Sequence, residues 1–201
     1  MSDVTRRHLA DHAALVRSIE TLLPLVDDLA DRVCRAFDGG GRVWTFGNGG
    51  SAADAQHLAG ELIGRYLRTR RPLAAASLAT DPSVVTCIAN DFGYDDVFSR
   101  QIEAAARPGD VVIGFTTSGR SPSVVAGLAA GRAAGATTVL FGGGSDGLPA
   151  ADHADIALIV PSATTARIQE MHLLLLHLLS EVVDRWAAGE TDDETPGPEV
   201  G

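Results

Sequence analysis

Two short stretches of the sequence place metal-binding side chains at helical spacing. His57 and Glu61 are four residues apart in AQHLAGELI, and Gln169 and His177 are eight apart in RIQEMHLLLLHLL. On a helix, residues four apart project from one face, and residues eight apart project about 80° from one another. Two nitrogen and two oxygen donors would suit Zn²⁺ or a similar divalent ion. Taken alone, however, each pair is better explained as a solvated surface pair.

The helical spacing does not decide which histidine would accompany Gln169. His172 projects about 60° from Gln169, on the opposite side from His177. Four leucines, residues 173 to 176, immediately precede His177, so we expect His177 to point into a buried place. His8, His12 and His153 are expected to be solvated.

Two loops rich in small residues could bind a phosphate group. VWTFGNGGSAADA and VIGFTTSGRSPSV each run from an apolar strand through such a loop into a helix, about seventy residues apart. The first turn of a helix offers unpaired N–H groups and the positive end of the helix dipole. Thr116, Thr117, Ser118 and Ser121 would add hydroxyl donors in the second loop. The alternative is an ordinary strand-to-helix turn, with Ser121 as its N-cap.

The first loop also satisfies a loose dinucleotide-binding pattern. Gly47, Gly49 and Ala52 fit G-x-G-x-x-A. A dinucleotide site also needs an acidic residue at the end of the second strand, about 20 positions on. The chain reads RTRRPLAAASLATD there, and Asp81 comes too late. Dinucleotide binding is therefore disfavoured.

The elements that must carry these residues alternate between strands and helices. Apolar residues between Thr5 and Phe37 recur at threes and fours, which predicts helix, and Pro24 interrupts the pattern, so we expect two helical pieces or one kinked helix. Short apolar strands are expected at 43–46, 75–78, 111–115, 137–141 and 155–160. Helical stretches are expected at 52–66, 83–90, 97–106, 123–134 and 164–187. This order predicts an α/β fold of three layers, with a central parallel sheet covered on both faces and long helices at each end. The two loops would then face one cleft at the carboxyl ends of adjoining strands.

Length and charge narrow the class of protein. The chain has 201 residues, 45% of them hydrophobic, and a formal net charge of −10. Residues 1–188 are expected to form one domain with an N-terminal helical arm, and residues 189–201 a disordered acidic tail. The charge argues against a nucleic-acid backbone or an anionic membrane as the main partner.

The cysteines and the N-terminus indicate a cytoplasmic protein. Cys34 and Cys87 form no CxxC pair, so neither a disulfide framework nor a thiolate zinc site is indicated, and both are expected to be buried small hydrophobic residues. No apolar run approaches the length of about 18 residues that a membrane span needs, and no secretory h-region is present.

Four blocks together resemble the phosphoheptose isomerases, also called sedoheptulose 7-phosphate isomerases, of the SIS fold. They are GNGGSAADAQHLAGELIGRY, IANDFGYDDVFSRQIEA, TTSGRS and RIQEMHLLLLHLLSE, and the similarity runs from about Arg42 to Glu181. The resemblance implies a flavodoxin-like three-layer sandwich. It also implies a ketose–aldose isomerase that converts sedoheptulose 7-phosphate to D-glycero-D-manno-heptose 7-phosphate through an enediol, in heptose and nucleotide-heptose biosynthesis.

The resemblance also assigns roles to individual residues. It places one Zn²⁺ per subunit on His57, Glu61, Gln169 and His177, and it makes Glu61 and His177 the acid and base. The positions that match the family's substrate-binding residues are Asn48, Gly49, Gly50, Ser51, Glu61, Asn90, Asp91, Thr116, Thr117, Ser118, Ser121 and Gln169.

The assembly and the departures from the family complete this expectation. Similar enzymes are homotetramers whose active sites are completed at subunit interfaces. Arg120 stands where the family often has Asn, and Ala166 stands where some members have Asp, which could alter metal affinity. The alternative function is a non-catalytic SIS-domain module that binds sugar phosphates or a replication initiator.

Overall fold

Five parallel strands form the central sheet of the computed structural model, which describes residues 3–144 and 147–190. The strands are β1 (Val43–Gly47), β2 (Ala75–Ser77), β3 (Val111–Thr116), β4 (Thr137–Gly143) and β5 (Ile156–Val160), in the spatial order β2-β1-β3-β4-β5. This is the flavodoxin-like order, in which the direction of strand addition reverses between β1 and β3. Ligands of such sheets bind outside the carboxyl ends of the strands at that reversal.

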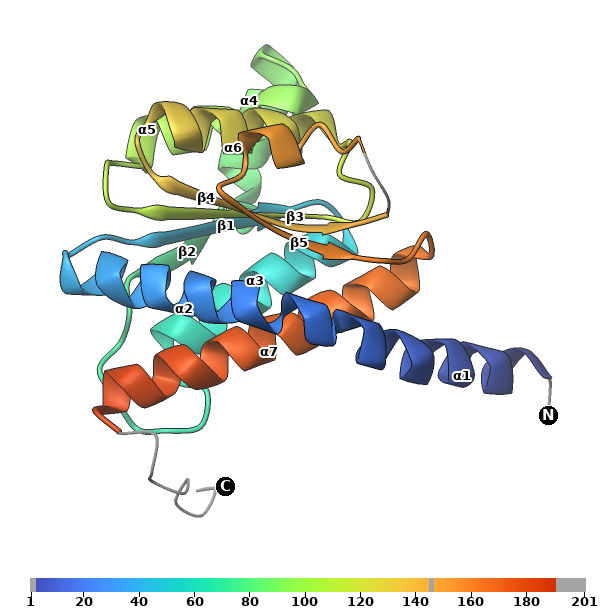
Figure 1. Cartoon of the computed structure of the whole chain (residues 1–201). Helices are drawn as coiled ribbons and strands as arrows, with labels where there is room; N and C mark the ends of the chain where they lie inside the picture. Colours follow the sequence, from blue (N-terminus) through green and yellow to red (C-terminus); the bar gives the residue numbers. More distant parts are fainter. Residues whose placement is uncertain (1–2, 145–146, 191–201) are drawn as a thin grey trace.

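Helices cover both faces of the sheet, as the alternating pattern predicts (Figure 1). One face carries α2 (Leu23–Asp38), α3 (Gly50–Ile63) and α7 (Thr165–Ala188). The other face carries α4 (Pro82–Asp91), α5 (Ser99–Ala105) and α6 (Pro122–Ala133). The expected α/β sandwich with a parallel sheet is therefore confirmed.

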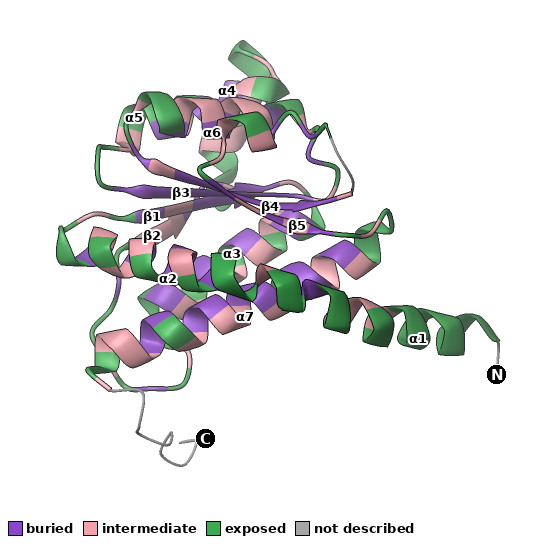
Figure 2. Cartoon of the chain, viewed as in Figure 1, coloured by how far each residue is buried: buried purple, intermediate pink, exposed green. Residues whose placement is uncertain are grey.

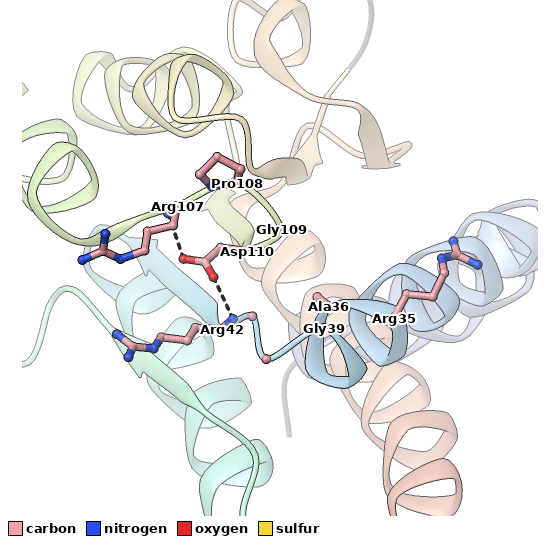
Figure 3. Close-up of a pocket in the computed structure, with 10 residues that line it drawn as sticks. Arg35, Ala36, Gly39, Arg42, Arg107, Pro108, Gly109 and Asp110 are labelled. Atoms are coloured by element: carbon pink, nitrogen blue, oxygen red, sulfur yellow. Dashed lines mark hydrogen bonds between the residues drawn. The ribbon is translucent and has the colours of Figure 1, made fainter.

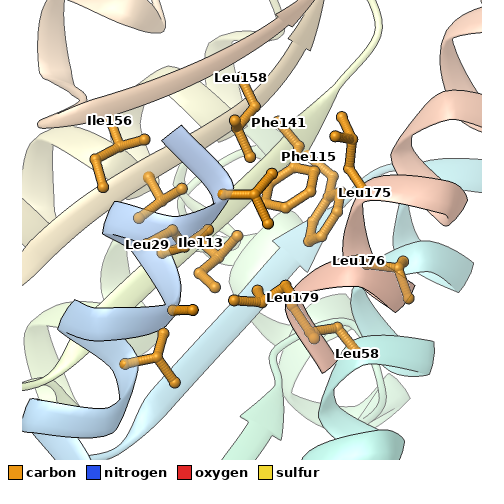
Figure 4. Close-up of a cluster of buried hydrophobic side chains, with 14 of the residues drawn as sticks. Leu29, Leu58, Ile113, Phe115, Phe141, Ile156, Leu158, Leu175, Leu176 and Leu179 are labelled. Atoms are coloured by element: carbon orange, nitrogen blue, oxygen red, sulfur yellow. The ribbon is translucent and has the colours of Figure 1, made fainter. Parts of the chain in front are cut away.

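The strands divide their side chains between two hydrophobic cores. Along β3, Val111, Ile113 and Phe115 enter the core under α2, α3 and α7, whereas Val112 enters the core under α5 and α6. The alternation follows from the two-residue period of a strand, and burial on both faces explains why the strands read as continuous apolar runs. Figure 4 shows the first core, where Leu29 of α2 and Leu175 of α7 close on the rings of Phe115 and Phe141. Figure 2 shows the same strands buried along most of their length.

The N-terminal stripe forms two helical pieces, as the break at Pro24 predicts. Helix α1 (Asp3–Ser18) is followed by a short 3₁₀ helix, η1 (Ile19–Leu22), and Pro24 then lies in the first turn of α2, where its missing N–H costs nothing. Helix α1 has no buried residue and projects from the body (Figures 1 and 2). It meets α7 through His12, whose Nδ1 lies 2.7 Å from Glu170 Oε2.

Some expected details differ from the structure. Helix α3 ends at Ile63 rather than Tyr66, because the chain turns at Gly64 into a long connection to β2. Cys87 is exposed, so its expected burial is wrong: it lies on a side of α4 that faces away from the core. Cys34 is half-buried, and burial, followed by Asp31 and Asp38, raises the pKa of its thiol to about 12.

Two further short 3₁₀ helices, η2 (Tyr94–Asp96) and η3 (Ala151–His153), complete the described elements. Apart from residues 189 and 190, the predicted acidic tail lies outside the described residues. Within the described ranges, no helix combines the length and the apolar character that a membrane crossing requires.

Candidate active site

Three of the four expected metal-binding side chains meet between α3 and α7. His57 Nε2 lies 2.9 Å from Glu61 Oε1 and 3.3 Å from His177 Nε2. One ligand atom from each residue lies within 4.8 Å of the other two. The side chains of His57 and Glu61 are 37% and 20% exposed, so a small molecule can reach them. The i, i+4 spacing on α3 aims that pair at one point, and the packing of α7 brings His177 to it.

The charges around this cluster favour an unprotonated imidazole on α7. Burial lowers the pKa of His177, the neighbouring His57 lowers it further, and Glu61 opposes both. A neutral imidazole is the form that binds a metal ion. One turn before His57, burial raises the pKa of Asp54 to about 6 against the opposing effect of His57, and Asp54 Oδ2 is buried without a hydrogen-bond partner.

The structure also separates the two histidines of α7: His177, which was expected to point into a buried place, is only half-buried, and His172 is the buried one. His172 is fully buried, with Nε2 3.0 Å from the Gly142 carbonyl oxygen and its ring against Phe115 and Phe141. Burial lowers its pKa to about 4, although the bond to Gly142 opposes the shift. Five residues turn a helix by about 500°, so His177 projects about 140° from His172. The face of α7 with His172 packs on the sheet, and His177 turns toward α3.

A polar cavity lies at the carboxyl ends of β1 and β3. Its volume is about 270 Å³, and residues from the β1–α3 loop, the β3–α6 loop and the start of α7 line it: Asn48, Gly50, Ser51, Phe115, Thr116, Thr117, Ser121, Thr165 and Gln169. Asn48 Nδ2 donates to Ser121 Oγ and Ser123 Oγ, both at 2.9 Å, and so ties the two loops together. Helices α3 and α6 begin at these loops, so the positive ends of their dipoles face these ends of the strands.

Gln169 is the fourth of the expected metal-binding side chains. It lines the cavity and lies two turns before His177 on the same helix. Its side-chain amide packs on Gly50, where a Cβ atom would lie 2.4 Å from Gln169 Nε2. Only glycine allows this approach. The neighbouring Gly49 takes a positive φ of 58° at the start of α3, which also favours glycine.

Other expected substrate-binding residues do not line this cavity. The Ser118 hydroxyl is exposed and accepts the N–H of Arg120 at 3.2 Å. Asn90 and Asp91 lie at the end of α4, where Asn90 Nδ2 donates to Asp91 Oδ1 at 2.7 Å.

Sequence reasoning missed Tyr94. Its hydroxyl donates to Asn48 Oδ1 at 2.9 Å and thereby links η2 to the first loop. The only sequence signal for it was its place three residues after Asp91 in IANDFGYDDVF.

A second cavity, of about 220 Å³, lies at the amino ends of β1 and β3, opposite the first cavity (Figure 3). Arg35, Arg42 and Arg107 line it. The Asp110 carboxylate accepts the backbone N–H of Arg42 at 2.9 Å and the backbone N–H of Arg107 at 3.0 Å. Helices α2 and α5 end here. The negative ends of two helix dipoles and the Asp110 carboxylate therefore lie at this cavity, and both would repel an anion. This cavity does not compete with the first one as a sugar-phosphate site.

Comparison with known proteins gives a consistent result. The SIS domain family model matches residues 8–143. A curated phosphoheptose isomerase of Roseiflexus sp. (strain RS-1) is 51% identical over 169 residues, which cover 84% of this chain and 85% of the relative. One of Trichlorobacter lovleyi is 44% identical over 94% of this chain and 96% of the relative.

The chain belongs to the phosphoheptose isomerase family.

The solved structure of a phosphoheptose isomerase from Neisseria gonorrhoeae has the same fold, with a TM-score of 0.84 at 36% identity, over 90% of this chain and 97% of that one. As a phosphoheptose isomerase family member, the chain is an enzyme, and its five-stranded parallel sheet with long terminal helices is the SIS fold. Membership of this family also suggests a use for the polar cavity and the histidine–glutamate cluster. Isomerisation of a sugar phosphate needs a site that binds the phosphate and an acid/base pair near the carbonyl end of the same molecule. Helix α7 borders both the polar cavity and the histidine–glutamate cluster.

Proposed function

We propose that this isomerase interconverts sedoheptulose 7-phosphate and D-glycero-D-manno-heptose 7-phosphate in heptose and nucleotide-heptose biosynthesis. The observation that carries the proposal is the placement of α7, which presents Gln169 to the hydroxyl-lined cavity and His177 to His57 and Glu61. A sugar phosphate held by its phosphate in the cavity would extend its carbonyl end toward the titratable cluster.

The cavity suits a phosphate although the protein is strongly acidic. Thr116, Thr117 and Ser121 offer hydroxyls, and α3 and α6 direct the positive ends of two helix dipoles at the cavity. Such a cradle is neutral overall, so binding does not depend on the net charge of −10.

Glu61 and His177 are our acid/base pair. One removes a proton from C1 of the ketose, and a proton is returned to C2 of the enediol while hydrogen also moves between the two oxygens. The lowered pKa of His177 leaves a neutral imidazole able to accept a proton near neutral pH. Gln169 would orient the sugar between the two regions.

We assign one Zn²⁺ per subunit to His57, Glu61, Gln169 and His177. Because Glu61 and His177 are also the proposed acid and base, each would exchange between the metal and the substrate during turnover. The three donor atoms that converge within 4.8 Å, two imidazole nitrogens and a carboxylate oxygen, form a donor set that suits zinc. When bound, zinc would polarise the carbonyl and stabilise negative charge on the enediolate oxygen.

The remaining assignments follow the family resemblance. Substrate-binding roles are proposed for Asn48, Gly49, Gly50, Ser51, Asn90, Asp91, Thr116, Thr117, Ser118, Ser121 and Gln169. We further propose that residues 1–188 form one domain, that the enzyme is a cytoplasmic homotetramer, and that its sites lie at subunit interfaces. The exposed arm α1, on which Leu9 is 70% exposed, supports an assembly in which the arm is covered.

The test combines metal analysis with NMR of sedoheptulose 7-phosphate in deuterated water. The proposal expects about one zinc per subunit, formation of the aldose, and deuterium entering at C1 or C2. A protein that binds the sugar phosphate without metal and without solvent exchange would instead be the non-catalytic module.

A further inference from the structure

A buried ion pair, Arg70–Asp184, joins α7 to the segment that follows α3, and these two helices carry the histidine–glutamate cluster. Arg70, in the connection from α3 to β2, donates from Nε to Asp184 Oδ1 of α7 at 2.9 Å. Both side chains are 1% exposed. An ion pair so fully removed from water is costly unless further hydrogen bonds satisfy both partners, so the remaining contacts of each are informative.

The Arg70 guanidinium closes the C-terminal end of α3. Nη2 donates to the Glu61 carbonyl oxygen at 2.6 Å, and Nη1 donates to those of Leu62 at 2.8 Å and Gly64 at 3.1 Å. Carbonyl groups of the last helical turn have no partner within the helix, and a cation there also complements the helix dipole. Arg70 therefore fixes the backbone of Glu61, whose side chain lies in the cluster.

The Asp184 carboxylate fixes the segment that follows α3. Besides Arg70, it accepts the N–H groups of Tyr66 at 3.4 Å, Leu67 at 3.1 Å and Arg68 at 2.7 Å. The ring of Tyr66 lies 5.7 Å from that of His177, centroid to centroid. Asp184 is seven residues beyond His177, so the two project from nearly the same side of α7.

These contacts join the C-terminal end of α3 and the segment after it to α7. Arg70 holds the turn of α3 that carries Glu61, Asp184 holds the loop that carries Tyr66, and both are anchored on α7 two turns beyond His177. We propose that the Arg70–Asp184 pair is a positioning device that sets the spacing of Glu61 and His57 on α3 against His177 on α7. The inference rests on the proposed function in that the cluster is the zinc site.

Arg68, in the same connection from α3 to β2, provides a matched control. Arg68 is also buried, and its guanidinium also pairs with α7 and the residues after it. Nη2 lies 3.0 Å from Glu181 Oε1, Nη1 lies 3.7 Å from Asp184 Oδ2, and Nε is bonded to Glu190. Arg68 therefore shares Asp184 with Arg70 and differs from it in the bonds that Arg70 makes to α3. No recorded hydrogen bond of its guanidinium reaches α3. Lysine at position 70 or 68 keeps the charge but loses the planar fork that bonds several partners at once.

The experiment measures Zn²⁺ affinity of the metal-free protein, by competition with a chromophoric chelator, in the wild type, Arg70→Lys, Asp184→Asn and Arg68→Lys. We expect Arg70→Lys and Asp184→Asn each to weaken zinc binding by about tenfold or more, and the double variant to be little worse than either single one. Arg68→Lys should lower the melting temperature and leave the zinc affinity within about twofold. If one position-70 or position-184 variant does not fold, the other carries the comparison.

A second readout needs no metal. In the metal-free wild type, the rings of Tyr66 and His177 should give an NMR cross-peak, which Arg70→Lys should weaken and Arg68→Lys should preserve. Wild-type zinc affinity together with an intact cross-peak in Arg70→Lys would overturn the inference. Failure of the wild type itself to bind zinc would instead remove the proposed zinc site, and the cross-peak alone would then decide whether the pair positions the cluster.

Discussion

The Gly50 backbone and the Gln169 side chain lie so close that a Cβ atom at position 50 would come within 2.4 Å of Gln169 Nε2. The amide is the far end of a flexible side chain, so Gly50→Ala can be accommodated if the amide swings away. We therefore expect Gly50→Ala to fold normally and to lose most of its turnover, measured as kcat/KM.

Gly60 provides the control on the same helix. A Cβ atom there would meet nothing within 4 Å. Gly60→Ala should stabilise the protein by about 0.5–1 kcal/mol, through helix propensity, and keep its activity. Full activity in Gly50→Ala would show that the contact with Gln169 has no role in turnover.

Glu61→Gln should lower kcat by at least about 10³-fold, because under the proposed function it removes both the proton-transferring carboxylate and a charged zinc ligand. The amide retains the volume, so the melting temperature of the metal-free protein should change little. Glu103→Gln removes an exposed carboxylate from α5, on the other face of the sheet, and is expected to be silent. Steady-state kinetics and thermal melts distinguish these cases, and an active Glu61→Gln enzyme would exclude Glu61 from the chemistry.

Ser121 and Ser123 both accept from Asn48, but only Ser121 lines the cavity. Ser121→Ala should raise KM about 5- to 20-fold with a small change in kcat, since one hydroxyl bonded to a charged phosphate contributes about 1–2 kcal/mol. Ser123 is 1% exposed, so Ser123→Ala should reduce stability and leave KM nearly unchanged. Equal KM effects in the two variants would contradict the assignment of the cavity to phosphate.

Removal of the metal by a chelator should abolish turnover and lower the melting temperature. Zinc at about 100 times its dissociation constant should restore about 2.7 kcal/mol of stability, because the ion binds the folded state. A His57→Ala variant should show no such response. Thermal melts over a zinc titration test this, and an equal zinc response in His57→Ala would place the metal elsewhere.

His172 should make the protein sensitive to acid. Its folded-state pKa is lowered to about 4, so its contribution to stability is complete above pH 6.5 and is lost as the pH falls from 6.5 to about 4. The loss amounts to at most about 3 kcal/mol. Asp54, whose pKa is raised to about 6, acts in the opposite direction, but it is common to both proteins compared below.

We therefore expect the drop in unfolding free energy between pH 7 and 4.5 to be smaller in His172→Leu than in the wild type. Urea denaturation at the two pH values measures this. Identical drops would mean that His172 is protonated as readily in the folded protein as in the unfolded one.

The sequence predicted the layers of the fold because its strands are short, continuous apolar runs between amphipathic helices. It also predicted that the loops after residues 46 and 115 face one cleft, since β1 and β3 are adjacent parallel strands. Family resemblance, rather than periodicity, separated His177 from His172.

Other features depend on tertiary packing and could not be read from local pattern. The leucines before His177 suggested burial, but which side of α7 meets the sheet is decided by the whole helix, and His172 lies on that side. The Tyr94–Asn48 and Arg70–Asp184 bonds join residues 46 and 114 positions apart, respectively, and no spacing rule predicts them.

His57 and His177 stand 120 positions apart in the chain, yet their ring nitrogens nearly touch. The ribosome synthesises the chain from its N-terminus, so α3 with His57 and Glu61 is made well before α7 with His177. A nascent polypeptide cannot assemble the complete cluster until the final helix has been synthesised and has docked. Binding of the proposed zinc ion would then report on completion of the fold, and a chain that ends before α7 would lack His177 as a ligand.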